Sequence, residues 1–135
     1  MENEVVKFKV DDKEIKFYLP DLEDHVQKTI SQLGDFYERE MLDDIRTHVS
    51  PGSLAIDVGA NIGNHTIYLS CICGMKVFAF EPYRPCFDML LRNIEINDVE
   101  GEVTAIQKAV GSVSGRGNPV VVSSQNLGQT KVVLY

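Results

Sequence analysis

Apolar and polar residues alternate in two short runs near the N-terminus. Residues 4–10 (EVVKFKV) and 14–19 (EIKFYL) place every second side chain on the same face, and residues 11–13 (DDK) between them have the composition of a turn. A period of two, interrupted by a short polar connection, is typical of a β-hairpin. We therefore expect the chain to begin with two antiparallel strands.

The apolar residues then repeat every three or four positions, which is the spacing of amphipathic helices. A first helix is expected to follow Asp21, whose side chain can cap it, and to end at Gly34. A second is expected over residues 36–49, before the Ser-Pro-Gly break at 50–52. Residues 1–50 thus form an N-terminal unit of one hairpin and two helices.

From residue 51 onward, short apolar runs alternate with helical patterns. The expected strands are 53–58, 76–80 and 102–110, and the expected helices are 64–73 and 85–97. This alternation is typical of parallel βαβ units. The predicted fold class is α/β, with a partial Rossmann-like sheet over residues 51–135. Two later β-like runs, 120–124 and 130–135, are interpreted as a second hairpin.

Composition is ordinary for a globular domain, with 135 residues, 44% of them hydrophobic and 24% charged. No apolar run reaches the length of about 18 residues that a membrane helix needs. The N-terminal residues are charged and lack the apolar core of a signal peptide. We expect a cytoplasmic protein with no membrane partner.

The net charge is −7, and the sequence contains no cluster or stripe of Lys and Arg. Nucleic-acid affinity depends largely on neutralising phosphates with basic side chains. The charge pattern therefore predicts no nucleic-acid partner, and a small molecule or neutral glycan suits this surface better.

The three cysteines, Cys71, Cys73 and Cys86, are expected to be free residues of the core or its boundary. Cys71 and Cys73 stand two positions apart on a predicted helix, so they point to different faces and do not form a metal-binding pair. No metal site is predicted.

The most informative stretch is the turn after the first parallel strand, which reads Asp57-Val58-Gly59-Ala60-Asn61-Ile62-Gly63. In open α/β sheets, ligands bind beyond the carboxyl ends of the strands. The glycines permit positive φ and let a ligand approach the backbone closely. Free N–H groups at the following helix suit a carboxylate, and Asp57 suits an ammonium group. Together they match the methionine end of S-adenosylmethionine.

Glu81 ends the next strand and can accept hydrogen bonds from both hydroxyls of a ribose. Pro82 and Tyr83 follow it and could cover one face of an adenine.

A dinucleotide site is the main alternative, but it expects a second glycine where Asn61 stands, and the acidic Asp57 disfavours a pyrophosphate. A strained turn that binds no ligand is a third interpretation.

These residues resemble the FkbM family of S-adenosylmethionine-dependent methyltransferases. The similarity is carried by AIDVGANIGNHTIYLS (55–70) and VFAFEPYRP (77–85), and by shorter matches between Gly34 and Gly111. It implies a class I methyltransferase fold and O-methylation of a hydroxyl on a sugar or small molecule. It also implies roles in cofactor binding for eight residues, namely Asp57, Gly59, Ala60, Asn61, Gly63, Glu81, Tyr83 and Glu38; Pro82 joins this set from its place beside Glu81. Glu38 is equally consistent with a solvated helix acid.

Domains of that family continue through further strands, so the resemblance predicts a C-terminally truncated chain that carries the cofactor half. Exposed sheet edges would then favour a homodimer. Two functions remain open: an enzyme, or a non-catalytic S-adenosylmethionine-binding module.

No catalytic residue is singled out. His65, at the start of the helix after the turn, could act as a base, although packing or capping is the favoured interpretation. His25 and His48 are expected to be exposed, and Tyr37 and Tyr68 to lie at the boundary of the core.

Overall fold

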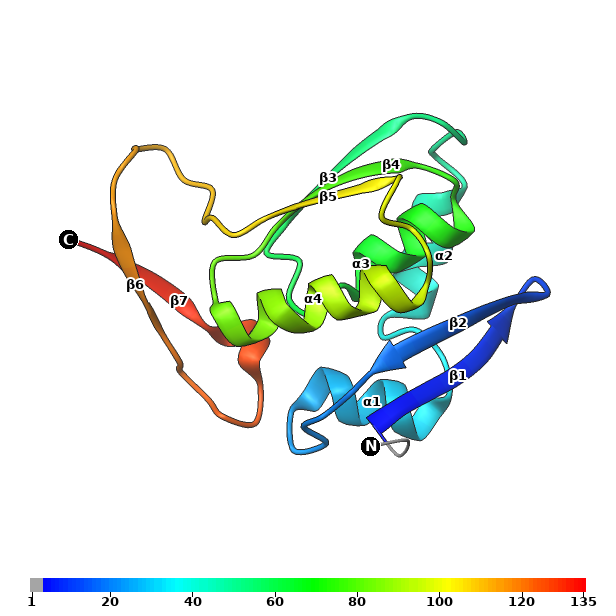
Figure 1. Ribbon diagram of the computed structural model, residues 1–135, viewed down its shortest axis with the longest axis horizontal. Helices are drawn as coiled ribbons and strands as arrows, with labels where there is room; N and C mark the ends of the chain where they lie inside the picture. The colour runs from blue at the N-terminus through cyan, green and yellow to red at the C-terminus, as the bar shows by residue number, and fades with distance from the viewer. Residues whose placement is uncertain (1–3) are drawn as a thin grey trace.

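The computed structural model describes residues 4–135 as a central parallel sheet flanked by two antiparallel strand pairs (Figure 1). In chain order the elements are β1 (Val5–Val10), β2 (Lys13–Tyr18), α1 (His25–Leu33), α2 (Arg39–Arg46), β3 (Leu54–Val58), α3 (Asn64–Ile67), the π-helix η2 (Tyr68–Ile72), β4 (Lys76–Phe80), α4 (Arg84–Ile96), β5 (Val103–Ile106), β6 (Gly117–Val120), the 3-10 helix η3 (Leu127–Gln129) and β7 (Lys131–Leu134).

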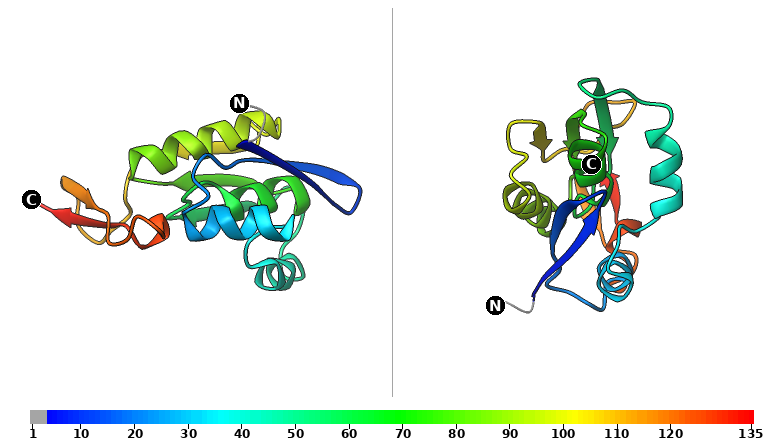
Figure 2. Two further views of the ribbon diagram at one scale, coloured as in Figure 1. Left: turned by 90° about the horizontal axis from the view of Figure 1, so that it is seen from below. Right: turned by 90° about the vertical axis from the view of Figure 1, so that its right-hand side faces the viewer.

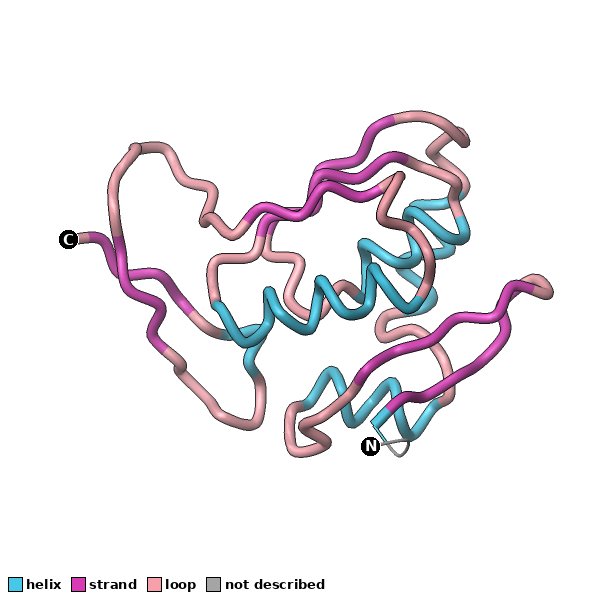
Figure 3. The backbone as a smooth tube through the Cα atoms, viewed as in Figure 1, coloured by secondary structure: helices cyan, strands magenta, loops and turns pink. Residues whose placement is uncertain are grey.

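The parallel sheet has the order β3-β4-β5, with Asp57 beside Ala79 and Ala79 beside Ala105. The helices α3 and α4 lie along one face of it, and the β1–β2 hairpin lies on the far side of those helices (Figures 1 and 3). Sheet, helices and hairpin therefore form successive layers, and the predicted α/β class is confirmed.

The opposite face of the sheet is open. Alternate side chains of a strand point to opposite faces, and β3 alternates between exposed and half-buried residues. Leu54, Ile56 and Val58 on β3, together with Phe78 on β4, are between 39% and 64% exposed. Parallel sheets are normally covered on both faces, so this apolar surface is unusual for its class.

The hairpin is attached to α4 by two asparagines one helical turn apart. Asn93 accepts a hydrogen bond from the Tyr18 N–H (2.7 Å), and Asn97 accepts from the Lys16 N–H (3.0 Å) and donates to the Lys16 carbonyl (2.7 Å). Their carboxamides take the place of a neighbouring strand along the edge of β2. Asn93, which is fully buried, also donates to the Ile62 carbonyl (2.8 Å) and so links the hairpin to the glycine turn.

Four predicted boundaries are wrong. The third parallel strand ends at Ile106, not residue 110. Its last pairing partner is Phe80, where β4 ends, and the chain beyond β4 leads into α4 and offers no further strand to pair with. Asp24, not Asp21, caps α1 by accepting from the Gln27 N–H (3.2 Å). The second helix is confined to α2, and the late hairpin begins at β6, ahead of the predicted 120–124 run.

The three cysteines are buried and free, as expected. His25 and His48 are exposed and Tyr37 is half-buried, also as expected. Tyr68 is instead fully buried and packs edge-on against Phe36 (5.1 Å between ring centres), so its placement at the core boundary is wrong. Across residues 4–135, no helix is both long and apolar enough to span a membrane.

Replacing Asn93 by Ala should lower the free energy of unfolding by about 2–4 kcal/mol, because the Tyr18 N–H and the Ile62 carbonyl would lose their hydrogen-bond partner. Urea denaturation measures the change. Arg92→Ala, at an exposed neighbouring position of the same helix, is the control and should shift stability by less than about 0.5 kcal/mol. Equal effects from the two variants would contradict this role of Asn93.

Candidate functional site

The turn between β3 and α3 wraps around the last carbonyl of β4. The N–H groups of Gly59 and Ala60 both donate to the Phe80 carbonyl at 2.9 Å. Gly59, Asn61 and Gly63 all have positive φ, at 75°, 56° and 101°. These are left-handed conformations, which glycine adopts without strain and asparagine tolerates better than most residues. The sequence therefore dictates a tight turn at the carboxyl end of the sheet.

Gly63 is required for packing as well as for its φ. A Cβ atom there would lie 2.9 Å from Cδ1 of Leu90, a fully buried residue of α4. The missing side chain lets α4 approach the turn closely, which is one role of the last glycine in nucleotide-binding turns of this kind.

Glu81 ties the turn to the end of β4. One carboxylate oxygen accepts from the Asn61 N–H (2.8 Å), and the other accepts from the Tyr83 N–H (2.9 Å). Its side chain is almost wholly buried, and burial raises the pKa of the carboxyl; the two N–H groups oppose that rise, and the nearby Asp57 carboxylate adds to it. Each carboxylate oxygen has two acceptor sites, so hydroxyl groups can still bind.

Asp57 and Glu38, both expected to bind the cofactor, differ in their relation to the cavity beside the turn: Glu38 lines it and Asp57 does not. Asp57 is half-buried, and its Oδ2 accepts from the Thr66 hydroxyl (2.6 Å), so it braces the helix that follows the turn. Glu38 lies directly before α2, with a φ of 57°. Asn64 holds this segment, because its side chain accepts from the Tyr37 N–H (2.9 Å) and donates to the Tyr37 carbonyl (2.8 Å).

Glu38 and the turn share one cavity of about 270 Å³. Its lining residues come from four segments of the chain and are Val26, Tyr37, Glu38, Gly59, Ala60, Asn61, Asn64, His65, Asn126, Gly128 and Gln129. Within it, His65 Nε2 lies 3.5 Å from the Glu38 carboxylate. Gly63, not His65, occupies the cap position of α3, so the capping interpretation of His65 is wrong.

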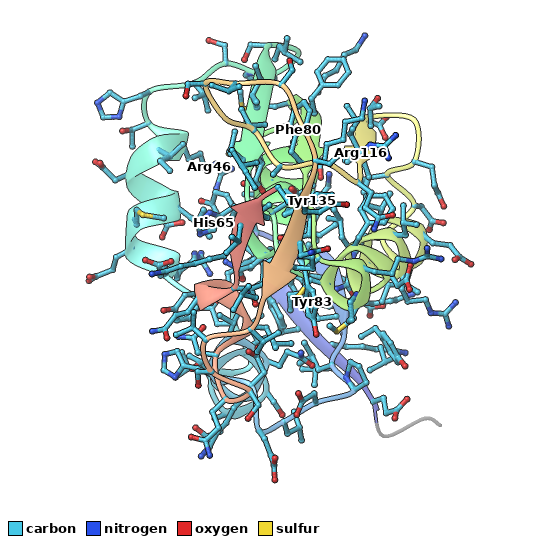
Figure 4. All side chains as sticks on the ribbon, turned by 90° about the vertical axis from the view of Figure 1, so that its left-hand side faces the viewer. Arg46, His65, Phe80, Tyr83, Arg116 and Tyr135 are labelled. Atoms are coloured by element: carbon cyan, nitrogen blue, oxygen red, sulfur yellow. The ribbon has the colours of Figure 1, made fainter. Side chains whose placement is uncertain are left out.

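The structure thus brings Glu38, Gly59, Ala60 and Asn61 together in the cavity, with Gly63 behind them and Glu81 hydrogen-bonded to Asn61. Pro82 and Tyr83 are half-buried beyond the end of β4, and neither lines the cavity. In Figure 4 the β6–β7 hairpin stands in front of the strand ends, with His65 to one side of it and Tyr83 to the other.

Sequence reasoning missed Asn64 and the residues of the C-terminal segment that line the cavity. Asn64 immediately follows the last glycine of the turn, so a buried polar residue there could have been suspected. Asn126, Gly128 and Gln129 carry no local signal, because they reach the turn only through the fold, more than sixty positions along the chain.

The chain is similar in sequence to a methyltransferase. It is 39% identical over 61 residues to Methyltransferase sdnD of Sordaria araneosa, a match that covers 44% of this chain and 24% of that protein. The chain thus matches about a quarter of this curated relative's length. No protein-family model matches the sequence.

The fold is that of class I methyltransferases. P. horikoshii TYW2, solved with MeSAdo, superposes with a TM-score of 0.56 at 19% identity, over 83% of this chain and 39% of that chain. The M. jannaschii tRNA m1G37 methyltransferase superposes with a TM-score of 0.55 at 18% identity, over 85% of this chain and 33% of that chain. These likenesses concern the fold alone.

Replacing Gly63 by Ala should lower the free energy of unfolding by about 1–3 kcal/mol. An alanine is strained at a φ of 101°, and its Cβ atom would clash with the Leu90 side chain. Thermal or urea unfolding measures the loss. Gly101→Ala is the control, because open space surrounds that position and its φ is not in the left-handed region. A variant of Gly63 as stable as that of Gly101 would refute the packing role.

The raised pKa of Glu81 predicts a specific dependence of stability on pH. A carboxyl with a raised folded pKa binds its proton more tightly in the folded protein. The stability that this proton uptake contributes is therefore fully present below the pKa that Glu81 has in the unfolded chain. It is lost as pH rises through the pKa that Glu81 has in the folded protein. In urea titrations across about pH 4 to 7, wild type should lose stability relative to Glu81→Gln as pH rises. A difference independent of pH, or one of opposite sign, would contradict the buried carboxyl.

Proposed function

We propose that this chain binds S-adenosylmethionine at the glycine turn and is the donor-binding part of a methyltransferase. The observation that carries the proposal is the hydrogen bond between the Glu81 carboxylate and the Asn61 N–H. It places a carboxylate that can accept hydrogen bonds from ribose hydroxyls beside a turn whose residues have positive φ. The unit formed by residues 51–135 holds this site, and residues 1–50 add Glu38 to it.

The residues present fit the methionine end of the donor. The cavity volume of about 270 Å³ is below the range of roughly 300–1,000 Å³ usual for a whole ligand, so one end of a larger molecule suits it. The Asn61 side-chain oxygen is buried and has no hydrogen-bond partner among the described residues, and the Glu38 carboxylate opens into the same cavity. An ammonium group would supply hydrogen-bond donors to both.

The remaining contacts follow the direction of β4. The free acceptor sites of Glu81 are assigned to the ribose hydroxyls, and Pro82 and Tyr83 to the adenine. Asp57 is assigned an indirect role: its hydrogen bond with the Thr66 hydroxyl holds the helix that follows the turn and so keeps the turn in its conformation. A Cβ at Gly59 would meet open space, which leaves room for a ligand, and the missing side chain of Gly63 lets α4 approach the turn.

Bound S-adenosylmethionine would supply an electrophilic methyl group on a sulfonium centre. Transfer of that methyl group to a hydroxyl would require a base to accept the hydroxyl proton. The His65 imidazole lines the cavity, and the Glu38 carboxylate, 3.5 Å from its Nε2, can orient the ring. His65 is therefore our candidate for the base.

We assign the chain to FkbM-type methyltransferases acting on a hydroxyl of a sugar or small molecule. The fold neighbours include enzymes named for tRNA, so the fold is equally compatible with a nucleic-acid acceptor. The charge of −7 and the absence of a Lys and Arg cluster favour the small molecule or glycan. A homodimer through the sheet edges stays a prediction. Within residues 4–135, β3 is an edge strand of the parallel sheet and pairs with β4 alone.

A non-catalytic binding module is the second candidate. It is favoured by the cavity volume of about 270 Å³, which is below the range of roughly 300–1,000 Å³ usual for one whole ligand. A methyl-transfer assay with radiolabelled donor and a panel of glycans, small-molecule alcohols and tRNA separates the two functions. Turnover by wild type that is lost in His65→Ala, with donor affinity retained, supports the enzyme.

Isothermal titration calorimetry tests the ligand directly. S-adenosylmethionine should bind and NAD should not, and Asp57→Ala and Glu81→Ala should each weaken binding by about 1–3 kcal/mol, or roughly 5- to 150-fold. Asp88→Ala, at an exposed position on α4, is the matched control and should leave affinity unchanged. A folded wild-type sample that gives no heat with S-adenosylmethionine would overturn the proposal.

A further inference from the structure

We propose that residues 125–130, the closing segment, form the outer wall of the donor cavity, and that Asn126 and Gln129 contact the amino-acid end of the donor. This inference rests on the proposed function. Asn126, Gly128 and Gln129 line the same cavity as Gly59, Ala60 and Asn61, so a ligand in it would contact both segments. The β6–β7 hairpin that carries the segment lies at the carboxyl-end side of the sheet in both Figure 1 and the left view of Figure 2.

The closing segment is anchored by a buried carboxylate. Asp24 is fully buried, and its Oδ1 accepts from the Leu127 N–H at 2.8 Å while its Oδ2 caps α1 through the Gln27 N–H at 3.2 Å. A second bond runs from the His25 N–H to the Gln125 carbonyl at 2.6 Å. Hydrogen bonds to a charged, buried acceptor are stronger than neutral ones, so the segment is held at a defined distance from the turn.

The segment also contacts the turn directly. A Cβ atom at Gly128 would lie 3.4 Å from Nδ2 of Asn61 and 3.2 Å from Oδ1 of Asn126. The absence of a side chain at Gly128 therefore lets the two polar loops approach without filling the cavity. The Leu127 side chain is half-buried against the core and secures the same stretch by apolar contact.

Polar groups of this boundary are left without partners. Asn61 Oδ1 on the turn and Thr130 Oγ1 at the end of the closing segment are both buried and make no hydrogen bond within the described chain. Buried polar atoms are nearly always paired, and exceptions mark functional sites or absent ligands. A donor ammonium between Asn61 and Glu38 would satisfy the Asn61 oxygen. The carboxamides of Asn126 and Gln129 can donate to its carboxylate.

Hydrogen–deuterium exchange of the full chain, with and without S-adenosylhomocysteine, tests the wall. That product analogue retains the amino-acid end. We expect slower exchange in two separate stretches, the glycine turn at 59–63 and the closing segment. Protection of the turn alone would overturn the closing-segment assignment and leave the proposed function standing. An absence of protection in both, with no heat on titration, would overturn both.

Paired variants give the second readout. Gln129→Ala should raise the dissociation constant for S-adenosylhomocysteine about 3- to 10-fold, the loss of roughly one hydrogen bond. Gln125→Ala is the matched control, because this exposed glutamine lies four residues earlier in the same segment and its side chain does not line the cavity. Both variants should keep wild-type thermal stability. Equal affinities for the two variants, in samples where wild type binds, would show that the segment only packs against the site.

Discussion

One buried carboxamide, that of Asn93, joins three parts of the molecule that would otherwise have no fixed relation. It binds the edge of β2, belongs to α4, and donates to the Ile62 carbonyl inside the glycine turn. The turn has few regular hydrogen bonds of its own, since its residues are neither helix nor strand. Because Asn93 lies on the helix that begins after Glu81, the same element positions both ends of the candidate site.

The acidic and amide side chains of the site have different structural roles. Glu81 and Asp24 are buried carboxylates that accept backbone N–H groups, and each connects two loops across the carboxyl end of the sheet. Asn64 clamps the chain before α2 and holds Glu38 at the cavity with an unfavourable positive φ. Strain of this kind persists only where surrounding contacts over-determine the backbone, and it concentrates at ligand sites.

Much of this arrangement was predictable from the sequence. Strand and helix periods indicated the βαβ order, and the glycines of the turn and Glu81 indicated where the strands end. Those features are local, because each depends on residues within one or two turns of chain. The contacts of Asn93 with Tyr18 and of Asp24 with Leu127 span 75 and 103 positions. Hydrogen bonds between a side chain and a distant backbone group produce no repeating pattern in the sequence. Neither the attachment of the hairpin to α4 nor the position of the closing segment beside the turn could therefore be predicted.

The open face of the sheet has a thermodynamic consequence. Leu54, Ile56, Val58 and Phe78 remain in contact with water in the folded state, so unfolding exposes less new apolar area at these positions than in a sheet covered on both sides. The heat-capacity increment of unfolding scales with that area and averages about 12–15 cal/mol/K per residue in globular proteins. The open face lowers this increment, which flattens the stability curve and weakens its dependence on temperature.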